Sequence, residues 1–531
     1  MKRIYIAMMT LAAALPSVAQ ETYENMKVAV EDLNGTARYV GMGGALEALG
    51  ADISTISTNP AGVGLLRKSS IAFSFGMVSQ EEAKDFSPGN KTNMSFDQAG
   101  FVWSGFDNDD AWLNFSFNFH KSRNFDFILS AADRLNEASQ NKLSCIKGLG
   151  GFLYKEAGGI PDFNKSLASC NQLDDIYARN LNYDTYDGLW YYYDASEYTM
   201  NRAHTGYIGE YDLNFSGAVN SQVFLGLTLG IHDVHYNHYS EYTERVIAAD
   251  EQGVYDFPLT VEDDRSITGT GFDLKAGAIV RPLEDSGFRI GAYVHTPTWY
   301  SLTTRNSTIV TDGDMTIPAG EAYDFKLYTP WRLGLSLGHT VGNMLALGAT
   351  YEYTDYGAMD TRYITDSYLD WYGDYHDNSS SDNIMNRHTE QTLKGVSTLK
   401  VGAELKPTPE LALRLGYNYV SPMYDKDGFK DGSLGTDGSY YSSATDFTNW
   451  DATHRITCGL GYTIGNVNLA LAYQYQTTKG DFRPFMNGVH TETIYDESNH
   501  PVEEITVKNQ CNPVKVNNKR HQVLFTLGYT F

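Results

Sequence analysis

The chain has 531 residues and a formal net charge of −25, which argues against nucleic-acid binding and against electrostatic capture of anions. Its mean hydropathy is −0.37, and beyond the N-terminus it lacks the roughly eighteen unbroken apolar residues of a membrane-spanning helix, which excludes a helical membrane protein. A chain this hydrophilic can still cross a membrane as alternating strands, because half of each strand then faces water.

The first residues have the pattern of a secretory signal peptide. Lys2 and Arg3 precede an apolar run from Ile4 to Leu15, and small residues at 17–19 offer a cleavage site before Gln20. We therefore expect residues 1–19 to be removed and to take no part in the fold.

Residues 20–68 do not alternate, and they precede the first predicted strand. The segment has about fifty residues, enough to fold into the lumen of a barrel. We predict that it forms a plug, distinct from a barrel domain that spans residues 69–531.

From residue 69 onward, apolar and polar residues alternate through most of the chain. Near the C-terminus Val523, Phe525 and Leu527 share one face of a strand, whereas Thr526 and Gly528 share the other. One face toward lipid and one toward a lumen is typical of outer-membrane strands. The pattern predicts an all-β fold, a fourteen-stranded antiparallel transmembrane β-barrel, with strands at residues 69–80, 96–106, 111–121, 205–217, 222–243, 268–281, 286–303, 321–338, 343–358, 393–405, 410–421, 452–463, 466–480 and 519–531.

The connections between these strands alternate between short and long. The short ones are residues 107–110, 218–221, 282–285, 339–342, 406–409 and 464–465. The long ones are residues 81–95, 122–204, 244–267, 304–320, 359–392, 422–451 and 481–518. Periplasmic turns and extracellular loops have this order in outer-membrane barrels, whereas a soluble sandwich has no reason to keep it.

The face that we assign to the lumen is rich in glycine and in charge. The glycines are Gly226, Gly230, Gly291, Gly334, Gly348, Gly402, Gly416, Gly459 and Gly461. They leave room for a plug, although relief of crowding at strand bends would also explain them. The charged residues are Glu210, Asp212, Asp273, Lys275, Arg289, Arg332, Glu352, Lys400, Glu404, Arg414 and Arg455, which we interpret mainly as cross-strand pairs in a hydrated interior.

The segment before the first strand carries a family resemblance. It reads Asn34-Gly35-Thr36-Ala37-Arg38-Tyr39-Val40-Gly41-Met42-Gly43-Gly44-Ala45, then Asp52-Ile53-Ser54, then Asn59-Pro60-Ala61-Gly62-Val63-Gly64. Gly41, Gly43 and Gly44, followed by Asn59, Pro60, Ala61 and Gly62, resemble the N-terminal hatch of the FadL/TodX family of outer-membrane channels for fatty acids and other hydrophobic compounds. Taken alone, Asn-Pro followed by Gly would be an ordinary turn. The resemblance is close over residues 30–75 and implies a fourteen-stranded barrel whose lumen holds the hatch.

Two features depart from the best-known branch of that family. An inward kink in an early strand opens a lateral window there, but residues 111–119 contain neither Gly nor Pro, so we place no window. The connection at 122–204 is also unusually long, and it contains Cys145 and Cys170, which we expect to form a disulfide in an oxidising compartment.

Candidate ligand-binding residues lie in the long connections and in the lumen. Aromatic side chains bury much area at low entropic cost and suit loose capture of apolar compounds. The aromatic candidates are Trp190, Tyr191, Tyr192, Tyr193, Tyr368, Trp371 and Tyr372. Arg332, Arg414 and Arg455 are the lumen cations that could meet a ligand carboxylate or anchor the hatch.

Two motifs that suggest other chemistry fit a barrel strand better. His232, His235 and His238 are three residues apart, so consecutive members point to opposite faces and we expect no metal site there. The run 334–338 matches a nucleophile elbow, but the alternation continues straight through it, so we expect no enzymatic activity.

We therefore expect an outer-membrane channel of a Gram-negative cell that takes up hydrophobic small molecules such as long-chain fatty acids and is gated by the hatch. The expected partners are that ligand, outer-membrane lipids and the barrel-assembly machinery, and we expect a monomer without cofactor, metal or nucleic acid. Two alternatives stay open: a secretion-system shuttle similar to the PorV type that binds exported proteins, and a hydrophilic porin that the N-terminal segment plugs in part. The ligand also stays open among fatty acid, aromatic hydrocarbon, steroid and haem.

Overall fold

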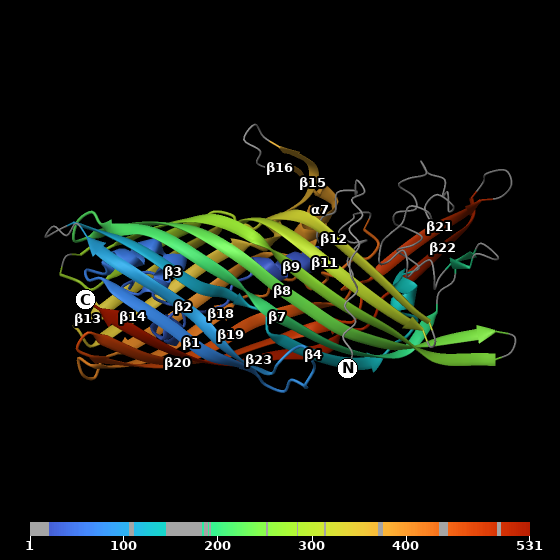
Figure 1. Cartoon of the computed structure of the whole chain (residues 1–531), viewed down its shortest axis with the longest axis horizontal. Helices are drawn as coiled ribbons and strands as arrows, with labels where there is room; N and C mark the ends of the chain where they lie inside the picture. Colours follow the sequence, from blue (N-terminus) through green and yellow to red (C-terminus); the bar gives the residue numbers. More distant parts are fainter. Residues whose placement is uncertain are drawn as a thin grey trace.

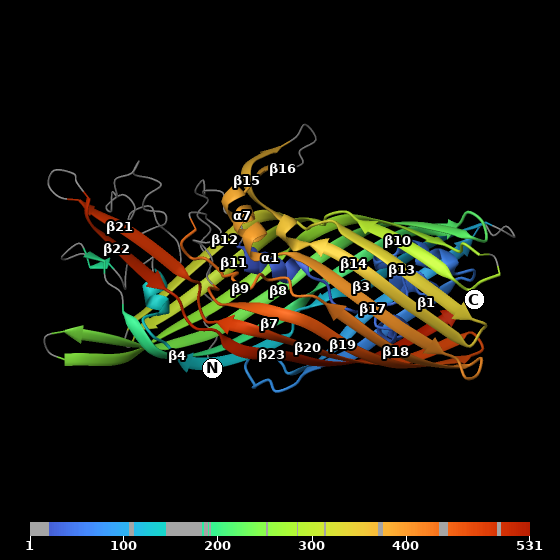
Figure 2. The same cartoon turned by 180° about the vertical axis from the view of Figure 1, so that it is seen from behind.

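The computed structural model describes residues 21–105, 111–144, 183–184, 189–190, 193–250, 253–283, 285–312, 315–369, 375–434, 444–495 and 501–531. Nineteen of the described strand segments form one closed antiparallel barrel (Figures 1 and 2), and two small two-stranded sheets lie outside it. The first strand, β1, pairs with β2 on one side and with the last strand, β23, on the other, which closes the barrel. Among the described residues, no helix is long and apolar enough to cross a membrane.

The wall contains fourteen strands when interrupted strands are counted once. They are β1 (Ser70–Gln80), β2 (Thr92–Gly105), β3 (Trp112–Asn124) with β4 (Phe127–Arg134), β7 (Asp194–Ala218), β8 (Val223–Asp250), β9 (Gly253–Val280), β10 (Arg289–His295) with β11 (Trp299–Asp312), β12 (Met315–Tyr328) with β13 (Arg332–Val341), β14 (Leu345–Asp355) with β15 (Asp360–Leu369), β16 (Tyr375–Ser381) with β17 (Gly395–Leu405), β18 (Leu411–Val420), β19 (Phe447–Ile464), β20 (Val467–Arg483) and β23 (Val514–Thr530). The predicted barrel with fourteen antiparallel strands is confirmed.

The outer face of the wall is apolar. Leu227 of β8 is 53% exposed and Leu335 of β13 is 64% exposed, while their polar neighbours Thr228 and Ser336 are buried inside the barrel. A belt of exposed apolar side chains around a closed barrel is stable only against lipid, and closure leaves no unpaired edge in the bilayer. The chain is therefore a multi-pass outer-membrane β-barrel.

Several strands continue beyond the predicted ends. Two predicted loops, 244–267 and 304–320, are wrong: β8 pairs with β9, and β11 with β12, along these residues. Polar strand residues outside the bilayer lack the apolar alternation, which is why the sequence pattern missed them. The connection 359–392 holds β15, β16 and α7 (Asn383–Thr392), which project from one side of the barrel (Figure 1), and 481–518 holds β21 (Gly488–Tyr495) with β22 (Pro501–Asn509).

The third wall strand is interrupted although it lacks Gly and Pro. β3 ends at Asn124 and β4 begins at Phe127, and the register against β7 shifts between Lys121 and Arg123. Asp32 of the N-terminal segment occupies this break, because its amide donates to the Ser122 carbonyl at 2.7 Å and its carboxylate accepts from the Asn124 amide at 2.9 Å. The break is therefore specified by a distant segment.

Residues 21–68 lie inside the barrel as short helical turns, seen in blue in Figures 1 and 2. The turns are α1 (Thr22–Ala29), α2 (Ala37–Gly41), η1 (Ile53–Ser57) and η2 (Pro60–Leu65). Each begins at a side chain that accepts a backbone N–H, as helix caps do; Thr36, Asp52 and Asn59 do so for α2, η1 and η2.

Glycines of the wall face these turns. A Cβ at Gly226 of β8 would lie 2.5 Å from the Ala61 amide nitrogen, and one at Gly43 would lie 2.9 Å from the Tyr417 nitrogen in β18. Gly402 likewise approaches the backbone of Met42. The absent side chains thus allow backbone-to-backbone packing between segment and wall.

Candidate functional site

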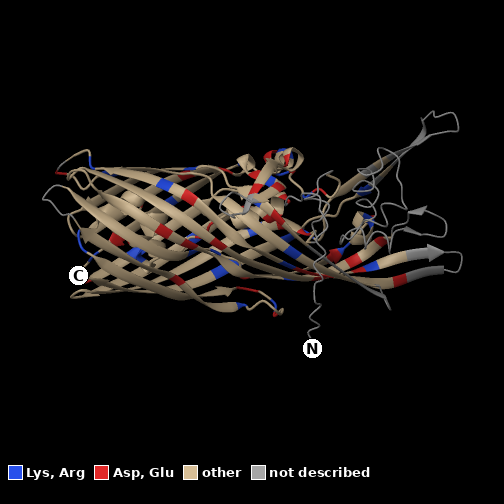
Figure 3. Cartoon of the chain, turned by 45° about the horizontal axis from the view of Figure 1, so that its top comes forward, with Lys and Arg blue, Asp and Glu red and all other residues tan. Residues whose placement is uncertain are grey.

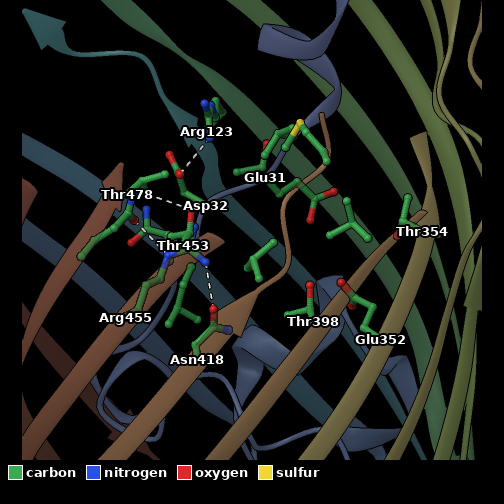
Figure 4. A pocket seen from close by; sticks show the side chains of 18 of the residues that line it. Glu31, Asp32, Arg123, Glu352, Thr354, Thr398, Asn418, Thr453, Arg455 and Thr478 are labelled. Carbon is green, nitrogen blue, oxygen red and sulfur yellow. Dashed lines mark hydrogen bonds and ion pairs between the residues drawn. The ribbon is translucent and has the colours of Figure 1, made fainter. Parts of the chain in front are cut away.

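A cavity of about 220 Å³ lies between the N-terminal segment and the upper wall (Figure 4). Residues between Met26 and Asn34, the stretch that follows the start of α1, form one side. The opposite side comes from β14, β17, β18, β19 and β20. The cavity therefore exists only because the segment enters the lumen.

One corner of the cavity is polar and centres on Asp32. Arg123 Nη1 lies 3.0 Å from Asp32 Oδ1, and Arg455 Nη1 donates to Asn418 Oδ1 at 2.8 Å (Figure 4). Burial alone would raise the pKa of Asp32, but Arg123, Arg520 and Arg455 outweigh it and lower that pKa. This corner therefore holds one carboxylate among three guanidinium groups.

A second polar corner links the segment to β13, β14 and β17. Arg332 Nη1 lies 2.6 Å from Glu31 Oε2 and its Nε lies 3.8 Å from Glu352 Oε1. Lys400 Nζ lies 2.9 Å from Glu47 Oε1 of the segment and 3.7 Å from Glu352 Oε2. Figure 3 shows charged residues along the wall, and Arg332 and Lys400 have partners both in the segment and across strands.

The lining of the cavity also includes apolar side chains. From the segment come Met26, Val30 and Leu33, and from the wall and its outer connections come Val396, Val420, Met423, Tyr424 and Trp450. Leu33 is buried, and Val420, Met423 and Trp450 pack against the largest apolar core cluster. The lining of the cavity therefore combines these apolar side chains with a larger number of polar and charged ones.

A buried charge cluster fixes α1 above the cavity. Glu24 lies 2.9 Å from Arg265, 2.8 Å from Lys27 and 3.2 Å from Lys430. Burial alone would raise the pKa of Glu24, but Lys27, Lys430 and Arg265 hold it well below its usual range. Because Arg265 belongs to β9 and Lys430 to the connection after β18, the cluster ties α1 to two separate parts of the barrel.

A second cavity, of about 110 Å³, adjoins the first toward the long hairpins. Both cavities are lined by Lys27, Arg123, Tyr424, Trp450 and Asn518. Because they share these lining residues, the two cavities are adjacent.

Of the three lumen arginines predicted as ligand contacts, two line the larger cavity and one does not. Arg332 and Arg455 line the larger cavity. Arg414 does not, because its Nε donates to Glu404 Oε2 at 2.7 Å, and Arg38 of the segment lies 3.1 Å from the same oxygen. Glu404 thus links Arg414 of the wall to Arg38 of the segment.

The predicted aromatic residues do not line either cavity where the structure describes them. Tyr368 of β15 is 49% exposed, and Tyr193 packs edge-on against Phe257 at 6.0 Å. Trp190 ends β6 (Leu189–Trp190), which pairs with β5 (Tyr183–Asp184). Tyr191, Tyr192, Trp371, Tyr372, Cys145 and Cys170 lie outside the described residues, so the predicted groove and disulfide stay predictions.

The glycine and Asn-Pro-Ala motifs lie where the segment meets the wall. Gly43 and Gly44 have φ of 64° and 81°, a region that favours glycine, and a Cβ at Gly41 would lie 3.3 Å from Gly459. Asn59 caps η2 and donates to the Glu47 carbonyl at 2.9 Å. Pro60, Ala61 and Gly62 are buried in η2.

Sequence reasoning missed the acidic residues of the cavity. In the cavity, Glu31 forms an ion pair with Arg332, and Asp32 forms one with Arg123. Both acidic residues lie between α1 and the glycine motif, in a stretch without a recognisable sequence pattern. Two adjacent carboxylates in a segment that is predicted to enter a lumen with arginine side chains could have predicted these ion pairs.

No family model matches the chain, and no curated protein matches it. Solved structures similar to it include the Pseudomonas putida toluene transporter TodX, with 12% identity, a TM-score of 0.46, and coverage of 94% of this chain and 99% of that one. They also include the Ralstonia pickettii toluene transporter TbuX, with 12% identity, a TM-score of 0.45, and coverage of 94% and 99%. A Pseudomonas aeruginosa FadL homologue has 11% identity, a TM-score of 0.48, and coverage of 95% and 100%.

Proposed function

We propose that this protein is an outer-membrane channel of the FadL/TodX type that takes up hydrophobic small molecules, with residues 20–68 as its hatch. The observation that carries the proposal is the cavity of about 220 Å³, whose lining includes apolar side chains of both the N-terminal segment and the wall and which lies directly against that segment. A compound that leaves this cavity toward the periplasm meets the segment, so passage requires the segment to move.

Packing inside the barrel supports this function over a hydrophilic porin. A porin needs a continuous wet path, whereas here the backbone of the segment packs on wall glycines such as Gly226, Gly402 and Gly416. Apolar residues of the segment add to the seal, because Met42, Leu46 and Ile56 are fully buried.

The two cavities provide an arrangement suited to apolar ligands. Trp450 and Tyr424 line both spaces, and binding sites for small molecules are commonly apolar pockets with a few polar groups. The charged groups of the lining would orient a ligand that carries a polar group, and its apolar side chains would contact the apolar part of the ligand. We keep both fatty acid and monoaromatic hydrocarbon as candidates.

Ligand binding to the purified protein tests the proposal. We expect radiolabelled long-chain fatty acid or toluene to bind in detergent and to quench the fluorescence of Trp450. Met423→Glu should weaken binding at least about tenfold, because an unpaired carboxylate in an apolar pocket is costly. The matched control is Met344→Glu, since Met344 lies in a turn and is 62% exposed.

Absence of binding for both ligands, or equal affinities of the two methionine variants, would contradict the proposal. If exported proteins instead co-purified with the intact barrel and ligands did not bind, the shuttle function would be favoured.

A further inference from the structure

A buried cluster of ionisable side chains lies on the lumen face of β3, β7, β8 and β9, apart from the charge pairs described above. Its centre is Lys275, whose ammonium contacts Glu210 and lies 3.0 Å from Asp212 Oδ1 and 3.0 Å from Asp273 Oδ1. His120 and His232 complete the cluster. A Cβ at Gly230 would lie 2.6 Å from Lys275 Nζ, so glycine at that position leaves room for these groups.

Two of the carboxylates present one oxygen to Lys275 and the other to His120. Glu210 Oε2 lies 3.5 Å from His120 Nε2, and Asp212 Oδ2 lies 3.6 Å from His120 Nδ1. These separations exceed a good hydrogen bond, which for these atoms is about 2.7–3.2 Å. One ion binds only one ring nitrogen of His120, so only one of these pairs can be a pair of ligands. The 3.5 Å between Glu210 Oε2 and His120 Nε2 is close to the roughly 3.4 Å that separates two ligands on one tetrahedral Zn²⁺ with bonds of about 2.1 Å.

The atoms that face one another have unmet polar capacity. Asp212 Oδ2, His120 Nδ1 and His232 Nδ1 are buried without a hydrogen-bond partner, whereas His232 Nε2 faces Asp273 Oδ2 at 3.3 Å. Asp212 is 0% exposed and His232 is 2% exposed. Buried polar atoms without partners are uncommon in folded proteins and call for an ion or another partner.

The formal charge of the cluster also favours a bound cation. With all three carboxylates ionised and both histidines neutral, Glu210, Asp212 and Asp273 would place three negative charges against the single positive charge of Lys275, a formal charge of −2. An uncompensated buried charge is strongly unfavourable. One divalent cation would neutralise the cluster.

We propose that His120, Glu210 and Asp212 form a binding site for a divalent transition-metal cation such as Zn²⁺. One ligand atom from each of these residues lies within 4.8 Å of the others, and imidazole with carboxylate is a donor set that such cations accept. Lys275 holds the remaining carboxylate oxygens and so orients both ligands.

A supporting residue lies beside these ligands. His232 Nδ1 lies 3.8 Å from Glu210 Oε2, and its Nε2 lies 3.3 Å from Asp273 Oδ2. Histidines that bind a metal commonly have the other ring nitrogen oriented by a carboxylate, so His232 is placed to become a further ligand.

The cation can reach this site from the larger cavity, because His120 lines that cavity. The histidine triplet of β8 did not reveal the site, since its ligands come from β3 and β7 and only His232 belongs to the cluster. A bound cation would join the third and fourth wall strands independently of ligand transport.

Metal content of the full-length protein in detergent tests the site. After treatment with EDTA and incubation with Zn²⁺, we expect about one equivalent bound by elemental analysis, and Co²⁺ in its place should give the visible absorption of a low-coordinate site. His120→Ala and Asp212→Asn should each lower Zn²⁺ affinity at least about tenfold to a hundredfold. His235→Ala is the matched control, because this histidine of β8 faces outward with 45% of its side chain exposed.

Asp212→Asn keeps the shape of the side chain, so it remains informative if His120→Ala does not fold. Substoichiometric Zn²⁺ in the intact protein, or equal affinity in Asp212→Asn and His235→Ala, would overturn the proposal. A melting temperature of the metal-free protein that responds to pH between about 5 and 8 but not to Zn²⁺ would also overturn it, since two protonated histidines then balance the cluster.

Discussion

Replacement of Gly226 by alanine should loosen the N-terminal segment without unfolding the barrel. The new Cβ would lie 2.5 Å from the Ala61 nitrogen and closer still to Pro60, whereas ordinary van der Waals contact begins near 3.4 Å. The difference requires a movement of about 1 Å. β8 is held by backbone pairing on both sides, Gly226 opposite Ser216 and Gly277, so the segment is the part that yields.

The size of the effect follows from overpacking. Inserting a methylene-sized group into a well-packed interior costs about 1–3 kcal/mol, and each 1.4 kcal/mol changes an equilibrium about tenfold. Gly226→Ala should therefore raise the fraction of undocked segment by about five- to a hundredfold.

Limited proteolysis of residues 21–68 in detergent and single-channel conductance in planar bilayers report on this fraction. The matched control is Gly528→Ala in β23, where a Cβ would lie 3.4 Å from Asn468 Cβ and would fit. Equal cleavage rates and equal conductance for the two variants would refute the view that wall glycines seat the segment.

Three further predictions concern how the segment is held. Asn59→Ala removes the cap of η2 and the bond to the Glu47 carbonyl, so it should destabilise docking by about 1–2 kcal/mol; unchanged proteolysis of the segment would contradict this. Glu47→Gln should cost about 3 kcal/mol, because Lys400 is buried and loses its nearest carboxylate; a thermal midpoint equal to that of the parent protein would argue against it. The pKa of Glu24 lies below its ordinary value of 4.5, so its stabilising effect is complete above that value and is lost as the pH falls through and below it. The protection factor of the α1 amides, which is the intrinsic exchange rate at each pH divided by the observed rate, should therefore fall below about pH 4.5 in the parent and be low at every pH in Glu24→Gln. A pH-independent protection factor in the parent would exclude Glu24 as the cause.

The barrel could be predicted from the sequence because lipid on one face and a lumen on the other impose strict alternation. Leu225, Leu227 and Leu229 face outward as their spacing requires. Where a strand leaves the bilayer this requirement ends, so the hairpin formed by residues 244–267 resembled a loop.

The site was less accessible to sequence reasoning because it is assembled from distant parts of the chain. Asp32 breaks the third wall strand through contacts with Ser122 and Asn124, and no local signal in β3 marks that position. Arg332 could be selected as a lumen cation, but its partner Glu31 could be identified only once the path of the segment was known.

Uptake in cells tests the central proposal most directly. A strain that lacks the gene would be complemented with the intact protein, with Met423→Glu or with Met344→Glu, and accumulation of radiolabelled long-chain fatty acid and toluene would be measured. We predict that the intact protein and Met344→Glu restore uptake of at least one compound and that Met423→Glu does not. Equal uptake in the uncomplemented and complemented strains would contradict the account.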